Sequence, residues 1–359
     1  MEISEILEIP PYSLNKIQKQ ELLNSNLNLL FRHHYDKCTP FKKMMDANKY
    51  EYLREYNFQD LPYLPVRLFK NFELKSISDE EVVKTMTSSG TSGQAVSKIY
   101  LDKETASMQT KTLTKIVSSF IGNKRVPMII IDSESVIKDR NLFSARGVGI
   151  LGFSIFGHKR IFALNNQMEL NINELKEFLD SHKGERIFMF GFTFMIYQHF
   201  YKELEKLDIK LDLSNALLIH GGGWKKLINE ALTPDIFKQK LNKVCNISQV
   251  YDYYGMVEQT GAIFMECENG HLHAPVFSDI IIRRVADFSI ADIGEKGIIQ
   301  VVSILPRSYP GQSLLTEDEG VIIGEDTCNC GRLGKYFKII GRIKQAEIRG
   351  CSDTYGASF

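Results

Sequence analysis

Apolar residues in the middle of the chain follow two spacings. Short apolar runs at 126–132, 186–191 and 216–220 predict buried strands. Between them, at 105–120 and 170–181, apolar residues recur at helical spacing, which predicts helices. Strands separated by helices of this length favour a parallel sheet with helices on both faces. The same alternation predicts helices over 194–207 and 234–243 and a strand over 246–253.

Residues on either side of this region have other patterns. The segment 1–60 predicts helices rich in Tyr, Leu and Lys, and the prolines of 61–65 predict a rigid connector because each proline fixes its own φ. Beyond about Ile263 the helical spacing fades, and strand-like segments joined by turns predict a β-rich subdomain. These segments are 280–284, 297–304, 320–324 and 336–340. The expected division is a helical segment 1–60, an α/β core 61–262, a β-rich subdomain 263–340 and a tail 341–359.

Composition and charge narrow the class of protein. The 359 residues are 43% hydrophobic and 25% charged, as in ordinary globular proteins. Because 44 basic and 44 acidic residues cancel, no overall charge favours nucleic acid as a partner. We find neither the roughly 20-residue apolar run of a membrane span nor the apolar stretch of a signal peptide. Six cysteines in a chain of this length do not indicate a disulfide framework, so we expect a reducing, cytoplasmic location.

A loop rich in glycine, serine and threonine suggests a site that binds the phosphates of a nucleotide. Residues Thr87 to Gly93 hold five hydroxyl side chains and two glycines between the strand-like segments 82–87 and 97–101. Backbone N–H groups and hydroxyls in such a loop can cradle phosphate oxygens, and Lys98 could add positive charge. The loop lacks both the Gly-x-x-x-x-Gly-Lys and the Gly-x-Gly-x-x-Gly patterns. Taken alone, a flexible surface loop is the simpler interpretation.

Four further segments follow this loop along the chain. They are Gly221 to Trp224, Tyr251 to Glu258, Thr316 to Asp318 and Gly341 to Lys344. With the loop, they resemble the ordered motifs of the acyl-adenylate-forming superfamily, which includes acyl-CoA ligases, luciferases and nonribosomal adenylation domains. The resemblance implies an α/β fold: the large N-terminal domain of that superfamily, with mixed and parallel sheets flanked by helices, plus a β-rich subdomain.

The resemblance also implies ATP and Mg²⁺ as cofactors. Glu258 would help to hold Mg²⁺, a hard cation that prefers oxygen ligands. Lys98 would add its charge to the phosphate site. The loop residues that would bind phosphate are Thr87, Ser88, Ser89, Gly90, Thr91 and Gly93.

The remaining motifs would hold the nucleoside. In the superfamily the glycine-rich turn lies against adenine, and the aromatic residue of the Tyr-Gly-x-x-Glu element stacks near it. The aspartate of the third motif accepts hydrogen bonds from the ribose hydroxyls, and the arginine of the last contacts ribose or phosphate. The matching residues of this chain are Gly222, Gly223, Tyr254, Gly255, Asp318 and Arg342.

The C-terminus narrows the resemblance to one branch. Most members of the superfamily continue past the last motif into a mobile domain, whereas this chain ends at Phe359, shortly after Lys344. We therefore expect the mobile C-terminal domain to be missing or reduced to a short tail. The stretches 62–69 and 341–354 are similar to the acyl-protein synthetases, the synthetase components of bacterial luminescence fatty-acid reductase systems.

Membership of that branch implies a thiol as acyl acceptor. A carboxylic acid, expected to be a fatty acid, would be activated as an acyl-adenylate and transferred to the enzyme's own cysteine, then to a partner reductase or another thiol-bearing partner. The matching cysteine is Cys351, and Arg349 could lower its pKa. The simpler alternative is a free thiol in a flexible tail. The expected catalytic residues are Cys351, Glu258 and Lys98.

Cysteines and histidines in the β-rich region suggest a metal site. Three thiols and one imidazole are a tetrahedral zinc set, and a small β-rich core gains stability from such a site. The imidazole would come from His273, with His271 as the alternative, and phenylacetate–CoA ligase-like relatives have a similar Cys-x-Cys-Gly-Arg pattern. Free cysteines beside a glycine turn are the other interpretation. The expected zinc ligands are Cys267, His273, Cys328 and Cys330.

Two other functions stay open. The chain could be an acyl- or aryl-CoA ligase similar to phenylacetate–CoA ligase, or a non-catalytic subunit that binds a reductase, although the intact nucleotide motifs argue against the second. The identity of the acid is not encoded clearly. The aromatic stretches 149–153 and 190–194 could line an acyl tunnel or fill the core, and His220 could touch the acyl group or be a core histidine.

Overall fold

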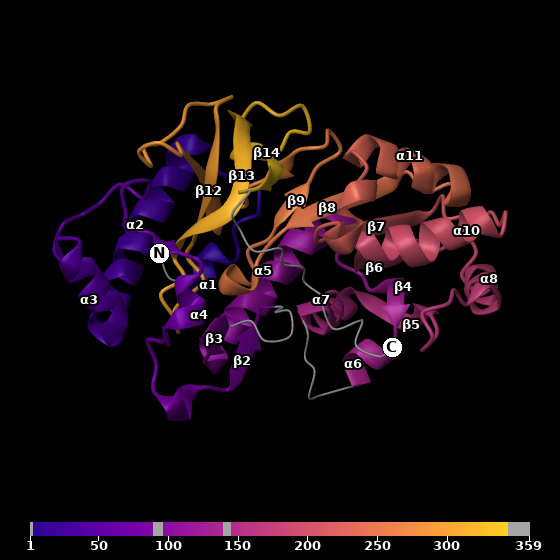
Figure 1. The fold of residues 1–359 in the computed structure, drawn as a ribbon, viewed down its shortest axis with the longest axis horizontal. Helices are drawn as coiled ribbons and strands as arrows, with labels where there is room; N and C mark the ends of the chain where they lie inside the picture. Colours follow the sequence, from indigo (N-terminus) through magenta and orange to yellow (C-terminus); the bar gives the residue numbers. More distant parts are fainter. Residues whose placement is uncertain (1–2, 89–95, 139–144, 344–359) are drawn as a thin grey trace. The chain divides into compact units, whose positions relative to one another are not determined.

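The computed structural model describes residues 3–88, 96–138 and 145–343 (Figure 1). These residues group into two compact units. The parallel unit, named after its sheet, comprises 120–138 and 145–254. The antiparallel unit comprises 3–88, 96–119 and 255–343. Within these ranges no helix is long and apolar enough to cross a membrane.

Five parallel strands form the sheet of the parallel unit, in the order β8–β7–β6–β4–β5. They are β4 (Val126–Ser133), β5 (Gly157–Leu164), β6 (Ile187–Phe192), β7 (Ala216–Gly221) and β8 (Gln249–Tyr254). Strand β4 pairs with β5 on one side and with β6 on the other, so the winding direction reverses there. In open α/β sheets, ligands bind at the carboxyl ends of strands near such a reversal.

The interior of this unit is mostly apolar and aromatic. Every residue of β6 and β7 is buried, as expected for apolar runs that are covered on both faces of a parallel sheet. Glycines leave room for rings to pack against the strands. A Cβ atom on Gly221 would lie 2.4 Å from the ring of Tyr253, so a larger residue there would displace that ring.

Helices connect the strands of the parallel unit. In α11 (Pro234–Cys245), Thr233 accepts a hydrogen bond from the N–H of Ile236, and Pro234 occupies the first turn. The helix ends at Asn246, which adopts the left-handed conformation that terminates helices. The other helical segments are α6 (Ser135–Lys138), α7 (Ala145–Phe153), η2 (Ser154–Phe156), α8 (Ile172–Ser181), α9 (Thr193–Met195), η3 (Ile196–Tyr201), α10 (Lys202–Lys206) and η4 (Lys225–Glu230).

The antiparallel unit contains a sheet in the order β11–β12–β13–β14–β10–β9. The strand β1 (Leu64–Pro65) adds a short parallel pairing with β13. A separate hairpin is formed by β2 (Lys84–Thr87) and β3 (Lys98–Leu101). The remaining strands are β9 (Phe264–Glu266), β10 (Leu272–His273), β11 (Ser278–Arg283), β12 (Lys296–Ser303), β13 (Ser313–Glu325) and β14 (Lys335–Arg342), with η5 (Val257–Gln259) preceding them.

Most of the described helices in this unit come from the first 80 residues of the chain. The longest, α2 (Lys16–Lys37), begins with a capping box in which Asn15 and Gln18 satisfy each other's backbone N–H groups. The others are α1 (Ile3–Ile6), α3 (Thr39–Ala47), α4 (Leu68–Asn71), η1 (Asp79–Glu81) and α5 (Lys103–Ile121), whose C-terminal end belongs to the parallel unit.

Buried charges join α2 to the antiparallel sheet. Lys19 of α2 lies 3.7 Å from the carboxylate of Asp279, which is also 3.3 Å from the ammonium group of Lys335. All three side chains are less than a tenth exposed. Both ammonium groups also donate to backbone carbonyls, those of Ala274 and Ile280. A buried charge is tolerated when it is paired and hydrogen-bonded in this way.

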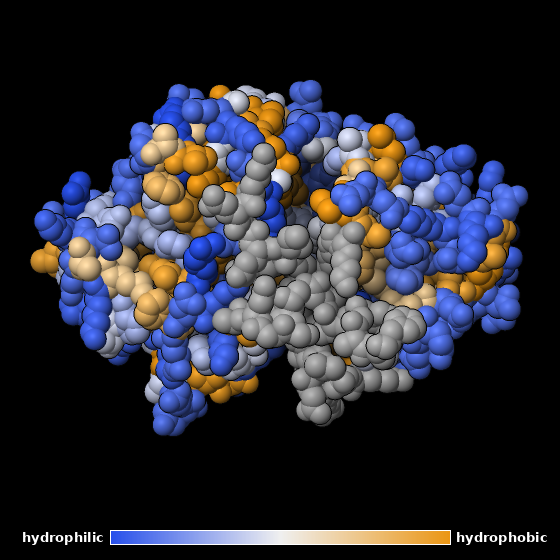
Figure 2. Space-filling view, viewed as in Figure 1, coloured by the Kyte–Doolittle hydropathy of each residue, from blue (hydrophilic) through white to orange (hydrophobic). Residues whose placement is uncertain are grey.

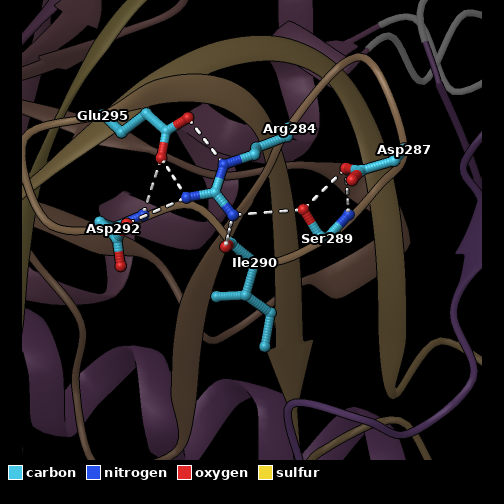
Figure 3. A network of polar contacts seen from close by, with 6 residues as sticks. All are labelled: Arg284, Asp287, Ser289, Ile290, Asp292 and Glu295. Atoms are coloured by element: carbon cyan, nitrogen blue, oxygen red, sulfur yellow. Dashed lines mark hydrogen bonds and ion pairs between the residues drawn. The ribbon is translucent and has the colours of Figure 1, made fainter.

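A second polar network holds the connection between β11 and β12 (Figure 3). The guanidinium of Arg284 donates to both carboxylate oxygens of Glu295, at 2.8 and 2.6 Å, and to the carboxylate of Asp292 at 3.0 Å. Its other terminal nitrogen donates to the Ile290 carbonyl and to the hydroxyl of Ser289. One side chain therefore fixes the course of twelve consecutive residues, 284–295.

In the coloured part of the face drawn in Figure 2, hydrophilic residues are widespread and hydrophobic residues form smaller areas between them, as expected for a chain whose apolar side chains are largely buried. The expected α/β class, with a parallel sheet and a β-rich part, is confirmed. The apolar pattern does not predict β5. Among the strands of the described residues, this edge strand pairs with β4 only, and it exposes Lys159 and Arg160, so it lacks the apolar run of the central strands.

Candidate functional site

The predicted phosphate loop connects the two strands of the β2–β3 hairpin. Thr87 pairs with Lys98 at the end of the ladder, and the next residue, Ser88, exchanges hydrogen bonds with Ser97. Lys98 is exposed. The hairpin thus pairs Thr87 with Lys98 where the loop begins and ends, and both are residues for which the sequence predicts phosphate binding. Ser89, Gly90, Thr91 and Gly93 lie outside the described residues.

Glu258 is buried, and hydrogen bonds fix the backbone around it. The phenol of Tyr309 donates to the Glu258 carbonyl at 2.9 Å. The neighbouring side chain of Gln259 donates to the carbonyls of Val301 and Gly311 at 3.1 and 2.8 Å. Burial raises the pKa of Tyr309, with the charge of Glu258 as a second cause, so the phenol keeps its proton and remains a donor. This segment follows Gly255, and it is rigidly held.

Asp318 and Arg342 are cross-strand partners in β13 and β14. The Arg342 Nε donates to the Asp318 carboxylate at 3.2 Å, and Arg342 Nη2 lies 3.6 Å from the carboxylate of Glu317. The hydroxyl of Thr316 accepts from the Asp318 N–H, which fixes the backbone of the Thr-Glu-Asp element. Two residues that the sequence places 24 positions apart are therefore adjacent.

In the parallel unit, the glycine-rich turn follows β7 directly. Gly222 has a φ of 78°, a conformation that favours glycine, and a Cβ atom there would lie 3.1 Å from the ring of Phe192. A Cβ atom on Gly223 would meet no atom within 4 Å. The next strand, β8, ends at Tyr254, which is half-buried. The turn and Tyr254 thus lie at the carboxyl ends of adjacent parallel strands, where an α/β sheet binds ligands.

His220 precedes this turn and is buried. Its Nδ1 lies 3.0 Å from the hydroxyl of Thr193, which also contacts the Gly221 carbonyl at 3.2 Å. Burial lowers the pKa of His220 to about 3, so the imidazole is neutral near pH 7. These contacts are typical of a core histidine. Through Thr193 they connect the end of β6 with the end of β7.

The two aromatic stretches pack against each other inside the parallel unit. The rings of Phe153 and Phe190 stack at 4.2 Å, and Phe190 also contacts Phe192 at 5.7 Å between ring centroids. Both Phe153 and Phe190 are buried. A Cβ atom on Gly149 would lie 3.0 Å from the Phe192 ring, so this glycine lets α7 approach β6 closely.

Three thiols and an imidazole meet in the antiparallel unit, and we call them the thiol cluster. The sulfurs of Cys267 and Cys328 are 3.9 Å apart, and Cys330 Sγ lies 3.3 Å from Nε2 of His273. These four ligand atoms all lie within 4.8 Å of one another. Tetrahedral zinc with bonds of about 2.3 Å to sulfur requires sulfurs about 3.8 Å apart. His271 also contacts Cys328, at 3.6 Å.

The surroundings of the thiol cluster change the pKa values of its side chains. Burial lowers the pKa of His273 to about 4, which leaves the imidazole neutral and able to bind a metal. Burial raises the pKa of Cys267 to about 12. Burial also acts to raise the pKa of Cys328, but hydrogen bonds outweigh it, the largest from the Cys330 backbone, and the pKa lies below its usual value. A bound cation would favour the thiolate form of all three cysteines.

Two charged residues that lie beside the predicted nucleotide motifs were not predicted from the sequence. Arg67 lies in the stretch 62–69, where a lone charge among apolar residues and prolines was the available signal. Glu317 lies inside the Thr-Glu-Asp element, where the superfamily has glycine. Their side chains form an ion pair at 2.8 Å. The predicted nucleophile, Cys351, lies outside the described residues.

Comparisons with known proteins show which family the chain resembles over its length. A family model described as acyl-protein synthetase, LuxE, matches residues 2–359. A long-chain-fatty-acid–luciferin-component ligase of Vibrio harveyi is 23% identical over 362 residues, covering 96% of this chain and 90% of that protein.

Solved structures with the same fold are adenylate-forming ligases. A structure of 2-hydroxyisobutyryl-CoA ligase in its thioesterification state has a TM-score of 0.70 at 12% identity, covering 94% of this chain and 70% of the ligase. An open conformation of the same ligase, with its acyl-AMP and CoA, has a TM-score of 0.69 at 11% identity, covering 92% and 71%. Because the family model covers nearly every residue, the chain belongs to the acyl-protein synthetase family and is an ATP-using ligase that activates a carboxylic acid as its adenylate.

Proposed function

We propose that this enzyme activates a long-chain fatty acid with Mg²⁺-ATP and transfers the acyl group first to Cys351 and then to a thiol of a partner reductase. The observation that carries the proposal is the whole-chain match to the acyl-protein synthetases. The name of the Vibrio harveyi relative supports a long-chain fatty acid as substrate and a second protein component as acceptor.

In the activation step, a carboxylate oxygen of the acid attacks the α-phosphorus of ATP and pyrophosphate leaves. Bound Mg²⁺ would neutralise phosphate charge, and the buried carboxylate of Glu258 is the residue proposed to hold it. Lys98 would add a positive charge where the loop joins the hairpin. Asp318 would accept hydrogen bonds from the ribose hydroxyls. The contribution of these residues is to orient ATP and to offset its charge.

In the transfer step, the thiolate of Cys351 attacks the carbonyl carbon of the acyl-adenylate. A thioester bond forms, the bond from the carbonyl carbon to the phosphate oxygen breaks, and AMP leaves with the electron pair. A thiolate is a strong nucleophile, and a thioester remains reactive enough for a second transfer. Each of these features suits an enzyme that hands its product to a partner thiol.

The thiol cluster is proposed to bind a structural zinc ion. The distance of 3.9 Å between two of its sulfurs is close to the value that a tetrahedral zinc site requires. Cys267, His273, Cys328 and Cys330 would be the four ligands, which leaves no coordination position for a substrate. The ion would connect the 267–273 and 328–330 segments and stabilise this part of the sheet.

Intact-protein mass spectrometry tests the proposed function. After incubation with Mg²⁺-ATP and a panel of fatty and aryl acids, the wild type should gain the mass of one acyl group, and hydroxylamine should remove it. The gain should persist in Ser352→Ala, a neighbouring control, and disappear in Cys351→Ser. An adduct that persists in Cys351→Ser would refute the role of this thiol, and turnover that depends on CoA would favour the CoA ligase alternative.

A further inference from the structure

A buried tyrosine connects α5 with the turn that carries Glu258. Tyr309 is fully buried, and its phenol donates to the Glu258 carbonyl at 2.9 Å. The side-chain amide of Gln109, on α5, donates to the phenol oxygen at 3.4 Å. Packing between α5 and the turn is close, because a Cβ atom on Gly261 would lie 2.7 Å from the backbone of Gln109. The turn therefore has little room to shift while these contacts hold.

The residue before Tyr309 contacts the β2–β3 hairpin. The hydroxyl of Ser308 donates to the carbonyl of Tyr100 in β3 at 2.8 Å. Lys98, which is proposed to add its charge to the phosphate site, lies two residues earlier on the same strand. Two consecutive residues therefore hold two parts of the proposed site for Mg²⁺ and phosphate: Ser308 contacts the hairpin, and Tyr309 contacts the turn of Glu258.

Buried hydrogen bonds also fix residues 306–309 to earlier parts of the chain. Nε2 of His34, on α2, donates to the Pro306 carbonyl at 3.0 Å, so Nδ1 is the acceptor of this neutral ring. The hydroxyl of Ser76 donates to that Nδ1 at 2.7 Å, and the Ser76 N–H donates to the Ser308 carbonyl at 2.8 Å. His34, Ser76 and Ser308 are all buried. The segment is thus anchored by contacts other than those with the hairpin and the turn.

The turn that carries Glu258 is short and depends on contacts of this kind. Helix η5 (Val257–Gln259) is a single three-residue turn, and helical segments of this length are not stable on their own. The next residue reaches the hairpin directly, because the Thr260 hydroxyl lies 3.8 Å from the sulfur of Met86 in β2. Mg²⁺ demands near-ideal coordination geometry. The position of the Glu258 carboxylate relative to the phosphates therefore decides how well it can hold the ion.

We propose that Ser308 and Tyr309 are positioning residues for Mg²⁺-ATP: they set the placement of the Glu258 carboxylate relative to the β2–β3 hairpin. This role rests on the proposed function. Without the phenol hydroxyl, the Glu258 carbonyl loses a buried donor, and the turn relaxes away from the geometry that Mg²⁺ requires. Without the Ser308 hydroxyl, the hairpin loses its contact at Tyr100 and shifts relative to the turn. Neither residue need touch the nucleotide.

ATP–pyrophosphate exchange across a Mg²⁺ titration tests this role, with an acid that supports exchange in the wild type. Tyr309→Phe keeps the buried ring and removes only the hydroxyl. The Mg²⁺ concentration that gives half-maximal exchange should rise by about tenfold, the effect of one buried hydrogen bond. Saturating Mg²⁺ should restore the exchange rate to about that of the wild type, because the variant weakens the binding of the ion.

Tyr56→Phe is the matched control. Its ring is also buried in the antiparallel unit, and its phenol accepts from the Glu51 N–H at 2.9 Å, a contact that involves neither the turn nor the hairpin. Both variants should lose similar stability in urea, and only Tyr309→Phe should shift the Mg²⁺ dependence. An equal shift in Tyr56→Phe would assign the effect to lost stability and refute the positioning role.

Ser308→Ala keeps the test decisive if Tyr309→Phe does not fold. It should raise the half-maximal Mg²⁺ concentration in the same direction, by about three- to tenfold. If Glu258→Gln shifts the Mg²⁺ dependence and neither Ser308→Ala nor Tyr309→Phe does, the positioning role alone is refuted. If Glu258→Gln leaves the Mg²⁺ dependence unchanged, the proposed role of Glu258 fails and the positioning role fails with it. A wild type without exchange on any acid refutes the proposed function itself.

Discussion

The strands β6 and β7 of the parallel unit and the strands of the antiparallel unit bury different kinds of side chain. Strand β4 of the parallel unit does not share this difference, because its buried Asp132 pairs with the buried Arg146 at 3.1 Å. In β6 and β7 nearly all buried side chains are apolar or aromatic, and His220 is the exception within them. The antiparallel sheet buries the charges of Asp279 and Lys335, the amide of Gln300 and the thiol cluster. Most of the residues that we propose to bind the nucleotide, among those with described positions, also belong to the antiparallel unit.

This difference indicates how each unit should respond to substitution. Apolar cores tolerate conservative changes of volume, because their contacts are numerous and individually weak. Buried ion pairs and metal ligands depend on single partners, so the loss of one leaves another charge unsatisfied. We therefore expect the antiparallel sheet to be more sensitive than β6 and β7 to isosteric polar changes and to metal removal.

The largest loss of stability is expected from a substitution in the buried ion pairs that join α2 to the antiparallel sheet. Asp279→Asn leaves the ammonium groups of Lys19 and Lys335 without their carboxylate and should lower the free energy of unfolding by about 3–5 kcal/mol. In the parallel unit, the equally conservative Ile130→Val should cost only about 1 kcal/mol. Urea denaturation measures both. Equal losses in the two variants would remove the contrast between the units.

Removal of the metal should affect one unit selectively. With zinc at about a thousandfold above its dissociation constant, binding contributes about 4 kcal/mol to stability. A chelator should therefore increase hydrogen exchange in β10 and β14, close to the thiol cluster, and leave β6 and β7 of the parallel unit unchanged. Purified protein should contain one zinc per chain, and Cys328→Ser should contain none. Full protection in metal-free protein would contradict a structural zinc.

Glu258→Gln should lower the rate of adenylation by roughly a hundredfold to a thousandfold. The substitution keeps the size of the side chain and removes the charge proposed to hold Mg²⁺. Its control is Glu203→Gln in the parallel unit, where the carboxylate pairs with Lys206 at the surface, 3.3 Å away. Initial rates measured across a Mg²⁺ titration should shift to higher Mg²⁺ in the Glu258 variant only. An unchanged Mg²⁺ dependence would exclude Glu258 as a ligand.

A smaller loss of stability is expected when the pH falls, because one histidine is buried. His34 lies between the Ser76 hydroxyl and the Pro306 carbonyl, and burial lowers its pKa to about 3. The unfolded chain, with a histidine pKa of about 6.5, therefore binds a proton below that pH while the folded chain does not. Stability should fall by about 2 kcal/mol between pH 7 and pH 5 on account of this residue. His34→Gln should lack this contribution, and an identical pH slope in the variant would contradict it.

The sequence predicted the central part of the fold well because local patterns determine it. The strands β4, β6 and β7 are apolar runs between helices of regular spacing, so their type and limits follow from the chain itself. Strand β5 was missed because it lies at the edge and exposes Lys159 and Arg160. The pairing of β1 with β13 joins residues 250 positions apart, which no local pattern specifies.

The motifs of the candidate site could be predicted from the sequence, but the neighbouring residues that contact them could not. Asp318 and Arg342 were found from resemblance, whereas their contact depends on the register of β13 and β14. The ion pair between Glu317 and Arg67 could not be predicted, because the long-range pairing of β1 with β13 brings Arg67 to Glu317. The four residues of the thiol cluster were predicted from their residue types and from a similar pattern in relatives, and the fold brings their ligand atoms together.

ATP–pyrophosphate exchange across a series of carboxylic acids tests the central claim most directly, because it reports adenylate formation without any acceptor. Exchange should depend on Mg²⁺ and on a long-chain fatty acid. It should proceed as fast in Cys351→Ser as in the wild type, since the thiol acts only after pyrophosphate has left. Absence of exchange with every acid, in folded protein supplied with zinc, would contradict acid activation by this enzyme.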